Sequence, residues 1–164
     1  MRTIEFNFDN VSGISAVYAI PPSDIRRLDR DYMTGLTRIV LQPDADIIHL
    51  PVYAQQQTLF SEEQQLTDGY DIYDVSLSVF IPRQNDPLLM ERLERGTWLV
   101  CHQDANGDIL LSGTTDIPLN FMAQRQKGGE EATGTKGVFS AQEPQRSVSV
   151  DRRAVFFENP SDTI

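Results

Sequence analysis

The sequence predicts a mainly β fold, an antiparallel β-sandwich or partly open barrel with one short α-helix at about residues 87–95. Three observations predict it. Apolar and polar residues alternate with a period of two in most apolar segments, which is typical of half-buried strands. Clusters of turn residues separate these segments. One segment combines the helical spacing of apolar residues with recognisable start and stop residues.

Four segments in the first third of the chain are predicted strands. Residues 3–8 and 14–20 alternate, and Pro21-Pro22 ends the second run because proline cannot donate to a ladder. Residues 36–41 form a third run. Residues 47–53 contain Pro51 and are expected as an edge strand or an extended loop. In the second run, one face is expected to carry Ile14, Ala16, Tyr18 and Ile20.

The clearest strand covers residues 70–81, where a mostly aliphatic face alternates with a largely polar one. Twelve residues at ~3.3 Å each span about 40 Å, roughly twice a typical strand. We therefore expect this strand to bend, or to form part of a barrel or sandwich wall. Residues 55–65 are a weaker candidate, because Leu59 and Phe60 are adjacent in a polar setting.

A helix is predicted over residues 87–95. Asp86 can cap it, a proline occupies the first helical position, and Gly96 suits a left-handed stop. Leu89 and Leu93 lie four residues apart and should bury together. Residues 24–32 are a second possible helix, but that segment is brief and highly charged.

The next unit is a hairpin, with strands at 97–103 and 108–112 around Asp104-Ala105-Asn106-Gly107. Asn-Gly is expected to supply the two positive-φ positions of a tight primed turn.

One domain is expected over 1–157, followed by a flexible tail at 158–164. The remaining predicted strands are 115–122, 138–141, 147–150 and 154–157.

Residues 124–137 are rich in glycine and polar residues, with no apolar side chain larger than alanine. Such a segment buries too little surface to offset its ordering entropy, so a mobile loop is expected. It contains Lys127 and Lys136, the two lysines of the chain. A flexible, locally cationic arm could reach an acidic neighbouring subunit; solubility alone is the plainer interpretation.

Charge and composition exclude several classes of protein. The 164 residues hold 14 Lys and Arg against 24 Asp and Glu, a formal charge of −10. An acidic surface repels phosphate backbones and anionic lipid, so neither nucleic acid nor membrane is expected as a partner. No secretory signal or ~20-residue apolar span occurs, so synthesis in the cytoplasm is expected. Cys101 is expected to be a small buried hydrophobe.

Motifs for catalysis or metal binding are weak. Asp104–Asp108 resembles a calcium loop in its alternating oxygens, but its glycine is fourth rather than sixth and its twelfth position is Thr115. His49 and His102 lack the spacing of zinc ligands, and each is more simply a strand residue. No nucleophile elbow or phosphate-binding glycine loop occurs. The sequence predicts no catalytic, metal or cofactor site, and an enzyme would need one histidine beside clustered carboxylates.

Arg26, Arg27 and Arg30 alternate with aspartates in a mixed-charge cluster. Its plainest interpretation is a solvated segment held by local ion pairs. The alternative is a subunit contact, because arginine is favoured in interfaces. Together with Lys127 and Lys136, these arginines are the candidate interaction residues.

From residue 70 onward, turn motifs follow in a characteristic order. The long strand ends at Ile81-Pro82, a short helix runs to Gly96, and W-L-V-C-H-Q-D-A-N-G-D-I-L-L-S-G follows. D-I-P-L-N-F, a Gly/Thr loop and V-F-S-A-Q-E-P at 138–144 complete the series. Over about residues 70–150, this order resembles phage and prophage tail proteins of Bacteroidetes-type bacteria. The resemblance implies a self-assembling structural protein with the β-sandwich or barrel of tube subunits.

The expected function is therefore that of a non-enzymatic structural protein of a phage or prophage tail-like particle. Its partners would be further copies of the chain or other tail-particle proteins, met through strand edges, and its final location would be the virion. The alternative is a module that binds a small ligand or a carbohydrate. The aromatic residues that such a site would use are Tyr18, Tyr53, Tyr70, Tyr73 and Trp98.

Overall fold

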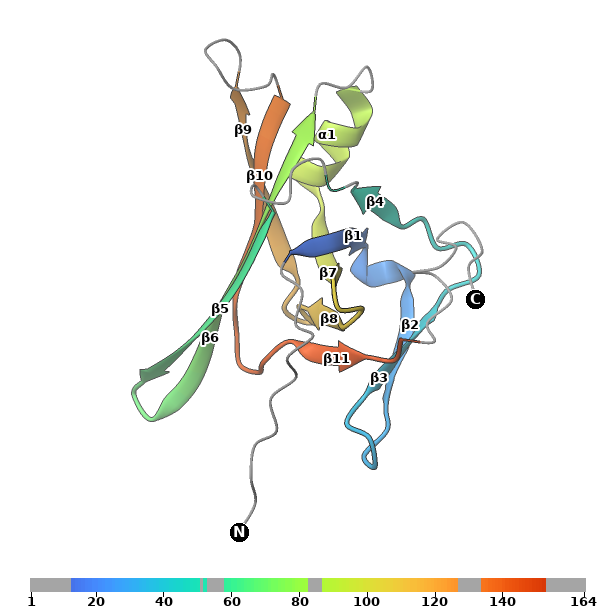
Figure 1. Ribbon diagram of the computed structural model, residues 1–164, viewed down its shortest axis with the longest axis vertical. Helices are drawn as coiled ribbons and strands as arrows, with labels where there is room; N and C mark the ends of the chain where they lie inside the picture. The colour runs from blue at the N-terminus through green and yellow to red at the C-terminus, as the bar shows by residue number, and fades with distance from the viewer. Residues whose placement is uncertain (1–12, 51, 53–57, 83–86, 127–133, 153–164) are drawn as a thin grey trace.

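The structure is a computed structural model that describes residues 13–50, 52, 58–82, 87–126 and 134–152 (Figure 1). Within them lie eleven strands, one α-helix (α1, Pro87–Arg95) and one 3-10 turn (η1, Pro22–Asp24). The predicted mainly β fold with one short helix is confirmed. The strands are β1 (Ile14–Ile20), β2 (Ile25–Arg30), β3 (Thr37–Leu41), β4 (Ile48–Leu50), β5 (Leu59–Thr67), β6 (Tyr70–Pro82), β7 (Thr97–Asp104), β8 (Ile109–Ser112), β9 (Leu119–Gln126), β10 (Gly134–Glu143) and β11 (Val148–Val150).

The strands form one large, mostly antiparallel open sheet that does not close into a barrel. Its order is β2-β3-β11-β8-β7-β9-β10-β6-β5, while β1 pairs with β7 and with β4. β7 joins the two halves: Thr97 and Trp98 pair with β9, and the residues from Val100 onward pair with β8. The short β4 pairs only with β1 among the described strands, so the predicted edge strand at 47–53 is confirmed over Ile48–Leu50.

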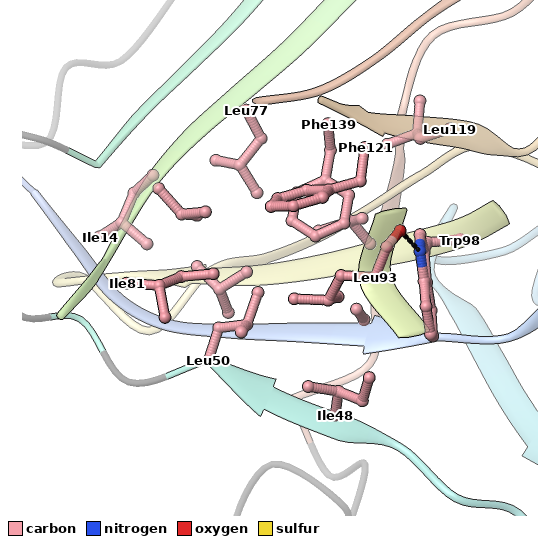
Figure 2. Close-up of a cluster of buried hydrophobic side chains, with 14 of the residues drawn as sticks. Ile14, Ile48, Leu50, Leu77, Ile81, Leu93, Trp98, Leu119, Phe121 and Phe139 are labelled. Carbon is pink, nitrogen blue, oxygen red and sulfur yellow. Dashed lines mark hydrogen bonds between the residues drawn. The ribbon is translucent and has the colours of Figure 1, made fainter. Parts of the chain in front are cut away.

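β1 and β7 lie between two hydrophobic cores, and β7 contributes to both. Trp98 and Val100 belong to the first core, whereas Leu99 and Cys101 belong to the second. Figure 2 shows the first core, where α1, β4 and β6 meet β9 and β10. The second core lies among β1, β2, β3, β7, β8 and β11. Cys101 is fully buried, as expected, and burial raises the pKa of its thiol far above the usual range.

The predicted helix is confirmed, with Leu93 fully buried and Leu89 packed against the first core. The predicted left-handed stop at Gly96 is wrong, because its φ is not positive. A Cβ at Gly96 would lie 2.8 Å from the Trp98 ring and 3.0 Å from the Arg92 carbonyl oxygen. Close packing, rather than backbone conformation, therefore explains this glycine. The proposed cap, Asp86, lies outside the described residues.

The possible helix at 24–32 is wrong, since β2 occupies most of that segment. The register of β2 against β3 shifts between Ile25 and Arg27, as at a β-bulge. The extra residue puts Ile25 and Leu28 on the same buried side although they are three positions apart. The bulge therefore reproduces the apolar spacing of a helix.

A second irregularity corrects the faces predicted for β1. The register of β1 against β7 shifts between Ile14 and Ala16. As a result, Ile14 packs in the first core, whereas Ala16, Tyr18 and Ile20 pack on the second. The strand is confirmed, but its four apolar residues do not share one face.

The β7–β8 hairpin is confirmed, but its turn is not the expected primed type. Gly107 has φ +89°, while Asn106 has no positive φ. The Asp104 carboxylate accepts the backbone N–H groups of Asn106 and Asp108, both at 2.9 Å. The Gly107 N–H donates to the Asp104 carbonyl oxygen at 3.0 Å. Side-chain capping by Asp104 therefore builds this turn, which also accounts for its calcium-like oxygens.

The long predicted strand is confirmed as β6, and it forms a hairpin with β5 that extends away from the body of the molecule (Figure 1). Asp68 and Gly69 form the two-residue turn, with φ values of +49° and +83°. Two consecutive positive φ values are typical of a primed turn, which matches the twist of the strands.

Substitution of Gly69 by alanine should destabilise the β5–β6 hairpin, because a left-handed conformation costs an L-residue about 1–2 kcal/mol. Chemical denaturation should show that Gly69→Ala lowers the free energy of unfolding by about 1 kcal/mol. Gly69→Asn should lower it less, since asparagine tolerates the left-handed conformation. Equal losses in both variants would contradict the role of backbone conformation.

The loop predicted at 124–137 is wrong over 124–126 and 134–137, which belong to β9 and β10. β9 extends to Gln126 and β10 begins at Gly134, leaving 127–133, which lie outside the described residues. A Cβ at Gly134 would lie 2.5 Å from the Phe80 ring, and one at Gly137 would collide with the Phe121 ring. Because these two glycines have no side chain, the aromatic rings can pack directly against the backbone of β10. Close packing, rather than flexibility, explains them.

The remaining predicted strands have mixed outcomes. Residues 36–41, 138–141 and 147–150 correspond to β3, β10 and β11. The strand expected at 115–122 instead begins at Leu119, after Pro118. The strands expected at 3–8 and 154–157, and the tail at 158–164, lie outside the described residues.

Candidate interaction surface

The two ends of the sheet are β2 and β5. In the part of the chain that the structure describes, each pairs with one neighbour only, β2 with β3 and β5 with β6. The outer edge of such a strand presents backbone N–H and C=O groups to another chain. A third edge strand, β4, pairs only with β1 among the described strands but is three residues long. The longer β2 and β5 are therefore the two candidate docking edges.

The β2 end is basic and has an apolar tip. Arg26, Arg27 and Arg30 all lie on this end strand and are exposed. The side chains at the tip of the β2–β3 hairpin, Tyr32 and Met33, are 89% and 95% exposed. Residues 25–41 hold four arginines against two aspartates, a net charge of +2. The structure thus brings the three predicted arginines together at one end of the sheet.

Local contacts occupy two of these arginines. The Arg27 Nε lies 2.9 Å from the Asp29 carboxylate, and both side chains are about half exposed. The Arg30 guanidinium carbon lies 5.8 Å from the centre of the Tyr32 ring. An exposed ion pair contributes about 0–1 kcal/mol, so these contacts would yield readily to a partner.

The β5 end is acidic. Residues 59–82 contain no lysine or arginine, and their net charge is −5. Glu63 of β5 lies directly opposite Asp74 of β6 in the ladder. Like charges at opposed positions destabilise a hairpin unless a cation lies between them. The five carboxylates are those of Glu62, Glu63, Asp68, Asp71 and Asp74.

The base of the β5–β6 hairpin is tied to the rest of the sheet. The Glu62 carboxylate accepts the Ser147 backbone N–H at 2.8 Å and the Ser147 hydroxyl at 2.6 Å. The Ser147 Oγ also lies 2.8 Å from the Ser112 Oγ. The Phe60 ring packs on the His102 ring, with centroids 4.4 Å apart. These contacts hold the base in place while Leu66, near the tip, stays 75% exposed.

Ser147, Glu62 and His102 do not form a catalytic triad. Within the described residues, the His102 Nδ1 has no hydrogen-bond partner, so no relay connects the imidazole to the carboxylate. Burial lowers the pKa of His102 to about 4, which leaves the ring neutral at neutral pH. The Ser147–Glu62 contact is therefore a tether.

His49 and the other metal-ligating residues give no centre either. The His49 ring stacks on the Tyr18 ring at 4.7 Å, and partial burial lowers the pKa of His49. Among the residues that the structure describes, no group of three or more His, Cys, Asp or Glu side chains could hold a metal ion.

The aromatic residues considered for a ligand site are divided between core and surface. Trp98 and Tyr18 are buried in the two cores, so both serve packing. Tyr73 is half-buried beneath the Arg146 guanidinium, and Tyr70 is exposed. Tyr53 lies outside the described residues.

Lys136 does not lie with the three arginines of β2. Lys136 lies within β10, half-buried, opposite Phe80 on one side and Gln124 on the other, so it is not on a loop. Lys127 lies outside the described residues.

Sequence reasoning missed Glu143, a buried carboxylic acid at the end of β10. The alternation of Phe139 and Ala141 along this strand, continued by one more step, would have placed Glu143 on the core-facing side.

Within the described parts of the chain, no helix combines the length and apolarity needed to cross a bilayer. The comparisons found no match for this chain among protein-family models, curated proteins or solved structures.

Proposed function

We propose that this chain is a non-enzymatic structural protein that assembles end to end, with β2 of one copy against β5 of the next. One observation carries the proposal: the two longer edge strands of the described sheet, β2 and β5, lie at ends of opposite charge. An added strand extends a sheet through backbone hydrogen bonds, and opposite charges select the partner. Because the chain has a net charge of −10, most surfaces of two copies repel each other. A contact between the basic end of one copy and the acidic end of the next is therefore favoured over contacts through other surfaces.

Such a contact joins two different surfaces of the same chain. Repetition of a contact of this kind closes into a ring or continues as a filament. The particle we propose is phage or prophage tail-like, because the order of turn motifs over residues 70–150 resembles that of tail proteins. A carboxylate-rich lumen in a cylindrical assembly would let DNA pass without binding it.

The first experiment is sedimentation velocity over a concentration series at low salt, with electron microscopy of the same samples. We expect association that rises with concentration and weakens with salt, and rings or filaments in the images. A strict monomer at the highest concentration would refute self-assembly.

Charge reversal tests which surfaces meet. Arg26→Glu with Arg27→Glu, or Glu63→Lys with Asp74→Lys, should each weaken association at least tenfold, because like charges then face each other across the contact. All four substitutions in one chain should restore it. Arg125→Glu, on the exposed part of β9 away from both ends, is the matched control and should leave association unchanged. Failure of the fourfold variant to recover would exclude the β2–β5 contact.

A further inference from the structure

The turn between β2 and β3 is held in one conformation by hydrogen bonds to Asp31. The Asp31 N–H donates to the Leu36 carbonyl oxygen at 2.9 Å, and the Asp31 carbonyl oxygen accepts the Gly35 N–H at 2.7 Å. The Asp31 carboxylate also accepts the Met33 N–H at 2.9 Å. Gly35 has a φ of +74°, which glycine adopts without strain. The turn is therefore preorganised, and none of these bonds uses the side chain of Tyr32 or Met33.

The same turn carries two large apolar side chains that its own geometry does not require. Turns favour small polar residues and glycine, yet positions 32 and 33 hold a tyrosine and a methionine, both almost fully exposed. The Arg30 guanidinium lies against the Tyr32 ring. Aromatic residues, methionine and arginine are enriched in protein interfaces, and a preorganised loop loses little entropy when it binds. This tip therefore has the composition and the rigidity of an interface anchor.

The tip of the β5–β6 hairpin is a matching surface. Leu66 and Tyr70 are 75% and 72% exposed, and their places in the ladder put them on opposite faces of the hairpin. Asp68 lies in the turn, and Asp71 lies opposite Leu66. Figure 1 shows that both hairpins extend away from the body of the molecule. One hairpin thus ends in apolar side chains bordered by arginine, and the other in apolar side chains bordered by carboxylates.

Charge favours one orientation of the two hairpins. β2 and β5 both run toward the tip of their own hairpin, so a parallel contact between them brings the two tips together. Arg30 then lies at the level of Asp68 and Asp71. An antiparallel contact instead brings Arg30 toward the start of β5, where residues 59–61 carry no charge. The parallel contact is therefore the one that pairs this arginine with carboxylates.

The spacing of the other charges fits the same orientation. Arg27 lies three positions before Arg30, and on β5 the same interval separates Glu63 from Leu66. Because strands rise by a constant amount per residue, tips that meet also bring Arg27 to the level of Glu63. Glu63 lies opposite Asp74 in its own hairpin, a like-charge pair that a cation at this level stabilises. One alignment therefore satisfies both the apolar tips and the charges.

We propose that β2 of one copy lies parallel to β5 of the next, and that Tyr32 and Met33 anchor this contact at the β5–β6 tip, where Leu66 and Tyr70 are exposed. The inference rests on the proposed function, and it adds the orientation of the contact and its apolar anchor. The charges along the strands select the partner, whereas burial of the apolar side chains slows its dissociation.

Removal of the apolar side chains tests the anchor by sedimentation velocity. Tyr32→Ser with Met33→Ser should weaken association at least tenfold, and this loss should persist at high salt, which screens only the charges. Leu66→Ser with Tyr70→Ser should weaken association similarly. All four substitutions together should weaken it no more than either pair, because each pair removes the same contact. Met122→Ser is the matched control, since Met122 is 72% exposed on β9, outside both hairpins, and it should leave association unchanged.

Cross-linking tests the orientation. The one cysteine of the chain, Cys101, is fully buried, so a cysteine introduced at an exposed position is the reactive thiol. Met33→Cys is mixed with Leu66→Cys or with Leu59→Cys, and a short bis-maleimide is added. The two β5 positions lie seven residues apart, about 23 Å along the strand, so the reagent distinguishes them. We expect a covalent dimer with Leu66→Cys, and little product with Leu59→Cys or from any variant alone.

The outcomes separate this inference from the proposed function. Predominant cross-linking through Leu59→Cys, or serine variants of the tip that associate as the native chain does, would overturn the inference and leave the β2–β5 contact in place. Association that the tip variants abolish and the charge reversals do not affect would retain the anchor and refute the charge pairing. A native chain that never associates would refute both.

Discussion

Replacing Trp98 by alanine should lower the free energy of unfolding by about 3–5 kcal/mol, the range for deletion of a large buried aromatic side chain. The Trp98 side chain is 2% exposed and fills the first core beside α1. Its Nε1 donates to the Leu93 carbonyl oxygen at 3.1 Å, a contact drawn in Figure 2. The indole therefore both fills volume and holds the end of the helix against β7. Urea denaturation followed by circular dichroism measures the loss.

Two further variants separate these roles. Trp98→Phe keeps an aromatic ring but removes the Nε1 donor. It should lower the free energy of unfolding less than Trp98→Ala does, because only one hydrogen bond, worth ~1 kcal/mol, and a smaller filled volume are lost. Met122→Ala on β9 is the control, because Met122 is 72% exposed, and its effect should stay within about 0.5 kcal/mol. A Trp98→Ala variant as stable as the native chain would show that this side chain is not a core residue.

Alanine at Gly137 should destabilise the protein by about 1–3 kcal/mol, the usual cost of overpacking. The sign is unusual, since Gly→Ala at a position without a positive φ normally stabilises by about 0.4–1 kcal/mol. Here the new methyl group would occupy the place of the Phe121 ring, which lies against the Gly137 backbone. The Phe121 ring also packs on the Phe139 ring at 4.8 Å, so it has little freedom to move away.

A double-mutant cycle tests this explanation by equilibrium denaturation. In a Phe121→Leu background, Gly137→Ala should cost clearly less than in the native background, because the smaller side chain leaves room for the methyl group. If Gly137→Ala lowers the free energy of unfolding equally in both backgrounds, contact with the Phe121 ring is not the cause of the destabilisation.

The sequence was most informative where one local rule decides the structure. Strand alternation along residues 70–81 and the helix spacing of Leu89 and Leu93 both predicted the correct element. Bulges defeated the same rules, because one extra residue changes which side chains face inward. That is why the segment around Ile25 and Leu28 suggested a helix, and why Ile14 was assigned to the wrong face.

Glycine was the second source of error, because its role depends on neighbours far away in the sequence. Gly134 and Gly137 suggested a loop, but rings of Phe80 and Phe121 explain both residues. In contrast, Asp68-Gly69 was a local signal for the β5–β6 hairpin that the prediction did not use.

For the candidate surface, the sequence identified the arginines of β2 as an interaction cluster but not the position of their strand. That position depends on the parallel pairing of β3 with β11, which brings together residues more than a hundred positions apart. Glu143 was missed because the predicted strand stopped two residues early.

The shared strand β7 also has a consequence for how the protein unfolds. The consecutive side chains Trp98, Leu99, Val100 and Cys101 alternate between the two hydrophobic cores, so β7 cannot leave one core without also leaving the other. Unfolding that displaces β7 from one core would also remove its side chains from the other core. The two layers should therefore behave thermodynamically as a single cooperative unit, and the amide hydrogens at the centre of β7 should be among the slowest to exchange.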